Sequence, residues 1–278
     1  MSDIDPSRLV FVGGLHRSGT TPFARALAEH HDISGISNSP AREDEGQHLQ
    51  RVYPKAKVYG GSGRFAYAAA AHLTEDSALV GPDNARAMVS AWEPYWDTTS
   101  RLLVEKSPPN IVMGRFLQAC FPGSAFIVVV RHPVTVALSN KKWRRFASAN
   151  PRKFETLSGL VDHWMVAHDI LADDLGHLDR ALVVHYEDLV QRPEVELGRV
   201  GRFLGLDSPL DTSSLSAAHG SAYAEWWAAL KSPLRPGGWQ RRRIERRYGE
   251  RMRSFGYEPD DLSAHHENTL DPLSRWSS

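Results

Sequence analysis

The sequence predicts an α/β protein of three layers, in which a central, mostly parallel sheet is covered by helices on both faces. Short apolar runs rich in β-branched residues recur along the chain, and longer segments with helical periodicity separate them. Strands that are apolar throughout are buried on both faces, and helical connections favour parallel pairing through right-handed crossovers. The 278 residues show no internal repeat and no linker, so we expect one domain over 1–278. The polar ends, about 1–6 and 259–278, are expected to be poorly ordered tails.

Five segments have the composition of buried strands. RLVFVGG begins the series, DISGI and RLLVEKS follow, and RALVVHYEDL ends it. SAFIVVVR is the strongest of them because six consecutive apolar residues lie in its centre. The expected strands span residues 8–14, 32–36, 101–107, 124–131 and 180–189.

Helical patterns fill most of the intervals between these strands. Two prolines precede NIVMGRFLQACF, and Pro133 begins PVTVALSNKKW; proline is well suited to the first turn of a helix. The alanine run AYAAAAHL and the segment NARAMVSAWEPYW are also typical of helices. Ser, Pro and Gly predict a loop over 207–238. The expected helices span residues 20–30, 64–98, 110–121, 133–143, 155–175, 193–206 and 240–255.

Composition argues against several classes of protein. Lys plus Arg and Asp plus Glu number 33 each, so no overall field favours nucleic acid or a membrane surface. The run AFIVVV is far shorter than the roughly 20 residues of a membrane span, and the N-terminus lacks an apolar signal core. A cytoplasmic protein is therefore expected. The single cysteine, Cys120, excludes an internal disulfide, and the 13 histidines contain no H-E-x-x-H motif for zinc.

The basic segment RRRIERRYGERMR is the strongest candidate for a nucleic-acid site. Glu245 and Glu250 interrupt it at spacings that allow ion pairs along a helix. It also lacks interleaved exposed aromatic residues, so we expect a solvated helix face and no nucleic-acid partner.

The first predicted strand runs into a loop that resembles a phosphate-binding loop with one departure. From Gly14 the spacing is G-x-x-x-x-G, but Thr20 stands where a nucleotide triphosphatase carries lysine. The glycines allow a tight turn, and the amides of residues 17–21 are expected to converge on an anion at a helix N-terminus.

A second feature suggests which anion this loop holds. The strand over 124–131 ends in Arg131, at the place where a triphosphatase has a carboxylate for Mg²⁺. A cation there repels Mg²⁺ and attracts another phosphate. The sequence therefore predicts two anion sites and no metal site, which fits a nucleotide with phosphate groups at both ends of its ribose.

Four motifs, and the order in which they occur along the chain, resemble those of sulfotransferases that use 3′-phosphoadenosine 5′-phosphosulfate (PAPS). More closely, they resemble the branch with an Arg-Ser-Gly-Thr-Thr loop, which includes tyrosylprotein sulfotransferases. The motifs are HRSGTT (16–21), EKSPPN (105–110), VVVRHPVTVALSNKKW (128–143) and VVHYEDLVQRPEVELGRVGRFLGL (183–206).

The resemblance implies a P-loop-like fold and metal-independent, in-line transfer of a sulfuryl group from PAPS to a hydroxyl, with 3′-phosphoadenosine 5′-phosphate (PAP) as product. Arg17 and Lys106 are the expected transition-state cations, since positioned charge carries such a reaction. The segment 235–239, RPGGW, is a candidate for a late loop that closes over the nucleotide. The expected donor-binding residues are Gly14, His16, Arg17, Ser18, Gly19, Thr20, Thr21, Arg131, Ser139 and Tyr186.

The acceptor hydroxyl needs a base, and an acidic segment, SPAREDEGQHLQ (residues 39–50), follows the second predicted strand. Related enzymes place a catalytic glutamate there. Glu45 is the first candidate, Glu43 the second and His48 the third. Crowding of Glu43, Asp44 and Glu45 is expected to raise at least one of their pKa values.

The acceptor itself is predicted only by class: a small molecule, glycan or lipid that carries a hydroxyl group. Trp92, Trp96, Trp226 and Trp227 lie in segments free to shape its pocket, and one or two are expected to line it. The composition is also compatible with a homo-oligomer.

Two other functions compete with sulfuryl transfer. An ATP–Mg²⁺-dependent kinase of a nucleotide or small molecule is disfavoured by Thr20 and Arg131. A non-catalytic nucleotide-binding protein would bind the donor without turnover, and the acids at 43–45 argue against it.

Overall fold

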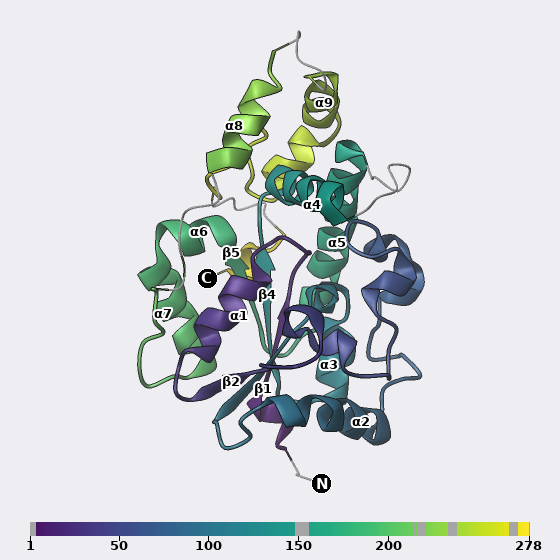
Figure 1. Cartoon of the computed structure of the whole chain (residues 1–278), viewed down its shortest axis with the longest axis vertical. Coiled ribbons are helices and arrows are strands. Elements are labelled where there is room, and N and C mark those ends of the chain that lie inside the picture. The colour runs from purple at the N-terminus through teal and green to yellow at the C-terminus, as the bar shows by residue number, and fades with distance from the viewer. Residues whose placement is uncertain are drawn as a thin grey trace.

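A computed structural model describes residues 4–147, 156–213, 215, 221–232, 238–266 and 272–277. Its centre is one sheet of five strands in the order β2-β3-β1-β4-β5, with every neighbouring pair parallel (Figure 1). The predicted α/β class with a parallel sheet is confirmed. The strands are β1 (Leu9–Gly13), β2 (Ile33–Gly35), β3 (Leu102–Lys106), β4 (Ala125–Val130) and β5 (Ala181–His185).

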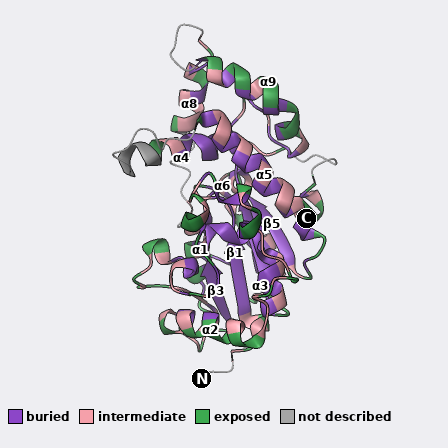
Figure 2. Cartoon of the chain, turned by 90° about the vertical axis from the view of Figure 1, so that its right-hand side faces the viewer, coloured by how far each residue is buried: buried purple, intermediate pink, exposed green. Residues whose placement is uncertain are grey.

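Alternate residues along each strand are buried in two separate hydrophobic layers. Val12 and Ile127 face the layer that packs against α1 (Thr20–Ala28) and α7 (Pro193–Leu204). Phe11 and Val128 face the opposite layer, which includes residues of α2 (Pro82–Trp92), α3 (Gly114–Cys120), α5 (Leu157–Leu175) and α9 (Gly238–Ser254). The strands are therefore buried on both faces, as the purple sheet in Figure 2 shows.

The carboxyl ends of the strands meet at one edge of the sheet. The loop after β1 leads into α1, β4 leads into α4 (Pro133–Ala147), and β5 leads directly into α6 (Tyr186–Gln191). The beginnings of three helices therefore face the same crevice, which is where open α/β sheets bind ligands.

The alanine-rich prediction over 64–98 is only partly correct. The first part forms short 3-10 turns, Phe65–Tyr67 and Ala69–Ala71, and a regular helix begins only at α2. Gly60, Gly61 and Gly63 adopt positive φ just before these turns and redirect the chain. Burial of Phe65 against α5 outweighs the weak helical propensity of alanine.

Three other boundaries differ from the sequence-based expectation. Residues 108–112 form a 3-10 turn before α3, so the two prolines begin that turn and not one long helix. Strand β5 ends at His185, because Tyr186–Gln191 turns into a helix. Helix α8 (Ser221–Ala229) lies inside the region expected to be a loop.

Part of the expected C-terminal tail packs against the sheet. Leu273 is fully buried and the 3-10 turn Ser274–Trp276 contacts β5, which also places the C-terminus beside this strand in Figure 1. Residues 1–3, 267–271 and 278 of the two expected tails lie outside the described residues. The single-domain assignment stays a prediction.

None of the helices in the described part of the chain is both long and apolar enough to cross a membrane. The cysteine Cys120 is buried and free, at the end of α3.

Candidate active site

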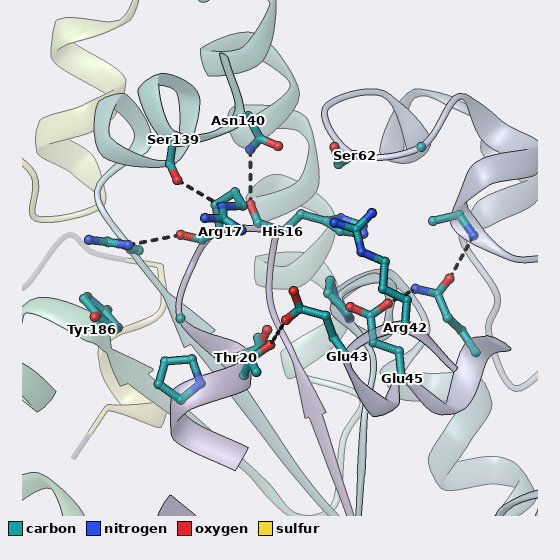
Figure 3. Close-up of a pocket in the computed structure, with 18 of the residues that line it drawn as sticks. His16, Arg17, Thr20, Arg42, Glu43, Glu45, Ser62, Ser139, Asn140 and Tyr186 are labelled. Atoms are coloured by element: carbon teal, nitrogen blue, oxygen red, sulfur yellow. Dashed lines mark hydrogen bonds between the residues drawn. The ribbon is translucent and has the colours of Figure 1, made fainter. Parts of the chain in front are cut away.

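A cavity of about 550 Å³ opens at the carboxyl edge of the sheet. The phosphate loop (residues 13–21), α4, α6 and α8 line one wall, and the acidic segment together with residues 56–62 lines the other (Figure 3). The cavity therefore collects residues that are far apart in the sequence, including most of those predicted for the site.

The phosphate loop has the backbone conformation of a tight anion-binding turn. Gly14 and Gly19 have φ values of 146° and 103°, and Arg17 also lies in the left-handed region at 78°. A Cβ atom at Gly19 would collide with the ring of Tyr186, and one at Gly14 would come within 2.5 Å of the Val129 carbonyl oxygen. Glycine is therefore required at both positions by sterics as well as by φ.

Cationic and hydroxyl groups from separate elements converge beside this loop. Arg17 Nε donates to Ser139 Oγ at 3.0 Å, and the hydroxyl of Tyr223 on α8 donates to the same oxygen at 3.2 Å. Arg131 donates to the Arg17 carbonyl oxygen at 3.2 Å, and its guanidinium carbon lies 4.2 Å from the centre of the Tyr186 ring. Such a concentration of donors suits an anion.

Across the cavity, the Glu45 carboxylate is nearly buried and held by three side chains. Gln47 Nε2 donates to Oε2 at 2.6 Å, Lys106 Nζ lies 3.5 Å from Oε1, and His48 Nε2 lies 3.5 Å from Oε2. Burial by itself would raise the pKa of Glu45. The hydrogen bond from His48, the charges of Lys106 and His16 and the bond from Gln47 outweigh burial and lower the pKa to about 2.

The predicted crowding of three carboxylates is wrong for this segment. Glu43 and Asp44 both adopt positive φ, which turns the three side chains in different directions. The exposed Glu43 accepts from Thr21 Oγ1 at 3.0 Å, whereas Asp44 accepts from the backbone and hydroxyl of Ser39 at 2.9 and 2.7 Å. The one resolved pKa shift among the three carboxylates, that of Glu45, is downward.

Lys106 lies behind Glu45, at the end of β3. Its side chain is buried, and its ammonium donates to the Glu43 carbonyl oxygen at 2.8 Å in addition to contacting Glu45. In this arrangement Lys106 fixes the acidic segment to the sheet.

Below Lys106, a second buried carboxylate connects the sheet to the acidic segment. Glu105 accepts from Ser107 Oγ at 2.6 Å and from Asn110 Nδ2 at 2.7 Å, and Ser107 Oγ in turn accepts from the Gln47 amide at 2.9 Å. A Cβ atom at Gly46 would collide with the Glu105 carboxylate. Burial raises the pKa of Glu105 to about 7, against the opposing hydrogen bonds from Ser107 and Asn110.

Several residues of the site have no place in the sequence-based prediction. Asn140 donates to the His16 carbonyl oxygen at 3.1 Å, and its position next to Ser139 in the same motif was a usable signal. Tyr223 comes from α8, in a region whose composition predicts a loop, so no local signal was available. Gln47 and Lys57 line the cavity from two short 3-10 turns.

The tryptophan prediction is wrong. Among the described residues that line the cavity there is no tryptophan, and the aromatic side chains there are Tyr186 and Tyr223. Trp92 and Trp227 are fully buried in the core.

Two other predicted features lie away from the cavity or outside the described residues. Residues 235–237 of the candidate late loop are not described, and Gly238 and Trp239 begin α9. The cluster of possible metal ligands found in the described part of the chain is His30, His31 and Asp32, just before β2 and thus at the opposite edge of the sheet.

Comparisons with known proteins agree with this geometry. A model of the sulfotransferase family matches residues 9–210. Protein-tyrosine sulfotransferase 2 of Gallus gallus is 24% identical over 203 residues, which cover 71% of this chain and 51% of that protein. The chain thus spans about half the length of this curated relative.

Two solved structures share the fold. Sulfotransferase STF9 from Mycobacterium avium superposes with a TM-score of 0.54 and 13% identity over 96% of this chain and 79% of its own. Mouse sulfotransferase SULT7A1 complexed with PAP superposes with a TM-score of 0.50 and 15% identity over 89% of this chain and 85% of its own. Because the family model covers most of the chain, the resemblance seen in the four motifs is confirmed, and the protein belongs to the sulfotransferase family.

Proposed function

We propose that this protein transfers a sulfuryl group from PAPS to an acceptor hydroxyl and releases PAP. The observation that carries the proposal is the convergence of Arg17 and Arg131 on one wall of a cavity whose opposite wall holds the buried carboxylate of Glu45. Two cations on separate loops suit a donor with phosphate groups at both ends of its ribose. The carboxylate lies where an acceptor can enter between the two walls.

The donor wall divides naturally into two anion sites. Thr20, Thr21 and the amides at the start of α1 are suited to the 5′-phosphosulfate, with assistance from the helix dipole. Arg131 and Ser139 hold the 3′-phosphate, and Tyr186 lies on the adenine side. Arg17 reaches Ser139 from the phosphate loop and so lies between the two sites. The remaining proposed donor contacts are Gly14, His16, Ser18 and Gly19.

In the proposed reaction the acceptor oxygen forms a bond to sulfur as the bond from sulfur to the 5′-phosphate oxygen breaks. Arg17 stabilises the charge that develops on the departing oxygen. The proton of the acceptor hydroxyl passes to the Glu45 carboxylate, which is ionised at neutral pH because its pKa lies at about 2. Lys106 keeps this carboxylate in place and is the second cation near the reacting groups.

Two other residues remain candidates for the base. Glu43 is exposed and bonded to Thr21 on the phosphate loop, so it suits a role in joining the two walls better than proton transfer. His48 lines the cavity with its ring 3.5 Å from Glu45 and is the stronger alternative.

The acceptor side favours a polar compound. Arg42, His48, Lys57 and Ser62 line it, together with the apolar residues Ala56 and Pro108. A hydroxyl-bearing small molecule, glycan or lipid headgroup fits these residues. The name of the Gallus gallus relative makes a tyrosine phenol a further acceptor to test. A cytoplasmic location, self-association and the absence of a metal requirement stay predictions.

Isothermal calorimetry tests the donor site directly. Adenosine 3′,5′-bisphosphate, which is the product PAP, and ATP–Mg²⁺ are titrated into wild type, Arg131→Ala and the control Arg101→Ala. The Arg101 side chain bonds the Gly205 carbonyl oxygen at the far edge of the sheet. We expect bisphosphate to bind without metal to wild type and to the control, and to lose about 100-fold in affinity in Arg131→Ala. Preference for ATP–Mg²⁺, or an unchanged affinity in Arg131→Ala, would favour a kinase.

A further inference from the structure

A tyrosine that follows the segment matched by the family model lies behind the donor wall of the cavity, the wall that carries Arg17, Arg131 and Tyr186. Tyr257 follows α9 and is fully buried. Its hydroxyl donates to Glu187 Oε2 at 3.3 Å and lies 3.0 Å from His185 Nδ1. A residue outside 9–210 is therefore bonded to the junction of β5 and α6.

Glu187 also bonds the segment that follows β4. Its other oxygen, Oε1, accepts from the backbone N–H of His132 at 2.9 Å. Glu187 directly follows Tyr186, and His132 directly follows Arg131. One carboxylate thus links the two chain segments that present Tyr186 and Arg131 to the cavity, and the guanidinium of Arg131 lies over the Tyr186 ring.

The same C-terminal segment also holds His132 by its side chain. His132 Nε2 lies 3.0 Å from the Glu258 carbonyl oxygen, and the Tyr257 ring packs edge-on against the His132 ring, with 5.2 Å between ring centres. Further along, the ring of His265 stacks on His185 at 3.4 Å. The ends of β4 and β5 are therefore fixed to each other from below by residues 257–265.

We infer that Tyr257 is a positioning residue for the donor: through Glu187 it sets the spacing of Arg131 and Tyr186. The inference rests on the proposed function, because it assumes that Arg131 binds the 3′-phosphate. Tyr257 itself does not line the cavity, so it affects the donor only through the positions of Arg131 and Tyr186.

The test compares two buried tyrosines of the same region. Tyr257→Phe removes the hydroxyl and with it the contacts to Glu187 and His185. The matched control, Tyr248→Phe, removes a hydroxyl on α9. This hydroxyl donates to Asp162 at 2.7 Å and does not contact the segments that carry Arg131 and Tyr186. Each variant is titrated with adenosine 3′,5′-bisphosphate and with adenosine 5′-monophosphate, and its thermal unfolding is recorded.

We expect Tyr257→Phe to raise the Kd for bisphosphate about fivefold, since the buried hydrogen bond to Glu187 is lost, and to change the Kd for monophosphate by less than about twofold. Tyr248→Phe should leave both values unchanged. Equal weakening of both nucleotides, or bisphosphate binding as in wild type, overturns the inference. Failure of wild type to bind bisphosphate would instead overturn the proposed function.

A second variant keeps the inference testable where Tyr257→Phe does not fold. Glu187→Gln preserves the shape of the side chain but replaces one accepting oxygen with a donor. It should weaken bisphosphate selectively, and in this background Tyr257→Phe should add little further loss. Fully additive losses would show that Tyr257 does not act through Glu187.

Discussion

The two walls of the cavity are built in different ways. The donor wall consists of strand ends and helix starts, at β1–α1, β4–α4 and β5–α6. The acceptor wall consists of successive 3-10 turns between residues 42 and 59. Figure 3 shows the two facing each other, with Arg17, Ser139 and Tyr186 on one side and Arg42 and Glu45 on the other.

What holds each wall follows from this difference. Backbone hydrogen bonds of the sheet and of regular helices form the framework of the donor wall, and the Glu187 side chain adds one link between the ends of β4 and β5. The acceptor wall depends on side chains: Trp92 Nε1 donates to the Gly46 carbonyl oxygen at 3.1 Å, and Ser107, held by Glu105, accepts from the Gln47 amide. The donor wall should therefore respond most strongly to changes in backbone conformation, and the acceptor wall to changes in buried polar groups.

The largest expected effect separates chemistry from donor binding. Glu45→Gln keeps the shape of the side chain and removes the base, so kcat should fall by about 100- to 10,000-fold while bisphosphate affinity stays as in wild type. Steady-state kinetics and calorimetry measure the two quantities. Glu43→Gln is the control, and its exposed side chain predicts a much smaller loss. If Glu43→Gln proves the more damaging change, the assignment of the base is reversed.

The second prediction concerns a substitution that disturbs the backbone of the donor wall. Gly19→Ala places a methyl group against the Tyr186 ring at a residue with φ of 103°, so Tyr186 must move away from Arg131. We expect the Kd for bisphosphate to rise at least about tenfold. Gly176→Ala is the control, because a Cβ atom there contacts nothing and φ is −66°. Normal donor binding by Gly19→Ala would show that the loop is not constrained in this way.

The same difference explains what the sequence could predict. The five strands follow from apolar runs, the phosphate loop with Arg17 from glycine spacing, and the second predicted anion site at Arg131 from its position at a strand end, all of which are local signals. Ser139 is a predicted donor contact only because the segment resembles the sulfotransferase motif. The directions of Glu43, Asp44 and Glu45 depend on positive φ values at two non-glycine residues, and no local pattern predicts these. Contacts made from a distance, such as those of Tyr223 and Tyr257, are decided by tertiary packing.

A third prediction contrasts the two buried carboxylates behind the acceptor wall. The pKa of Glu105 is raised from 4.5 to about 7, so the folded state keeps a proton that the unfolded chain has lost. Its contribution to stability is therefore full below pH 4.5 and is lost as the pH rises through 7, on the order of 3 kcal/mol in all. The pKa of Glu45 is lowered, so its contribution is present above pH 4.5 and is lost as the pH falls toward 2.

Urea unfolding at pH 5 and pH 8 measures this contrast. Glu105→Gln cannot titrate, so its stability relative to wild type should improve by about 1–3 kcal/mol between pH 5 and pH 8. Glu45→Gln should show no such gain, because Glu45 is ionised in both states over this range. A stability difference between Glu105→Gln and wild type that does not change with pH would mean that Glu105 titrates normally.

The smallest expected effect distinguishes the two candidate bases. If Glu45 takes the proton, kcat should be independent of the ionisation of His48, and His48→Gln should lower it by less than about tenfold. His48 supplies the largest of the interactions that lower the pKa of Glu45, so in this variant that pKa rises and the acid limb of the pH–rate profile moves to higher pH. Wild type should then stay active down to pH 5, with the variant losing activity at a higher pH than wild type does. If His48 is the base, wild type should instead lose activity as falling pH protonates His48, and His48→Gln should be nearly inactive at every pH.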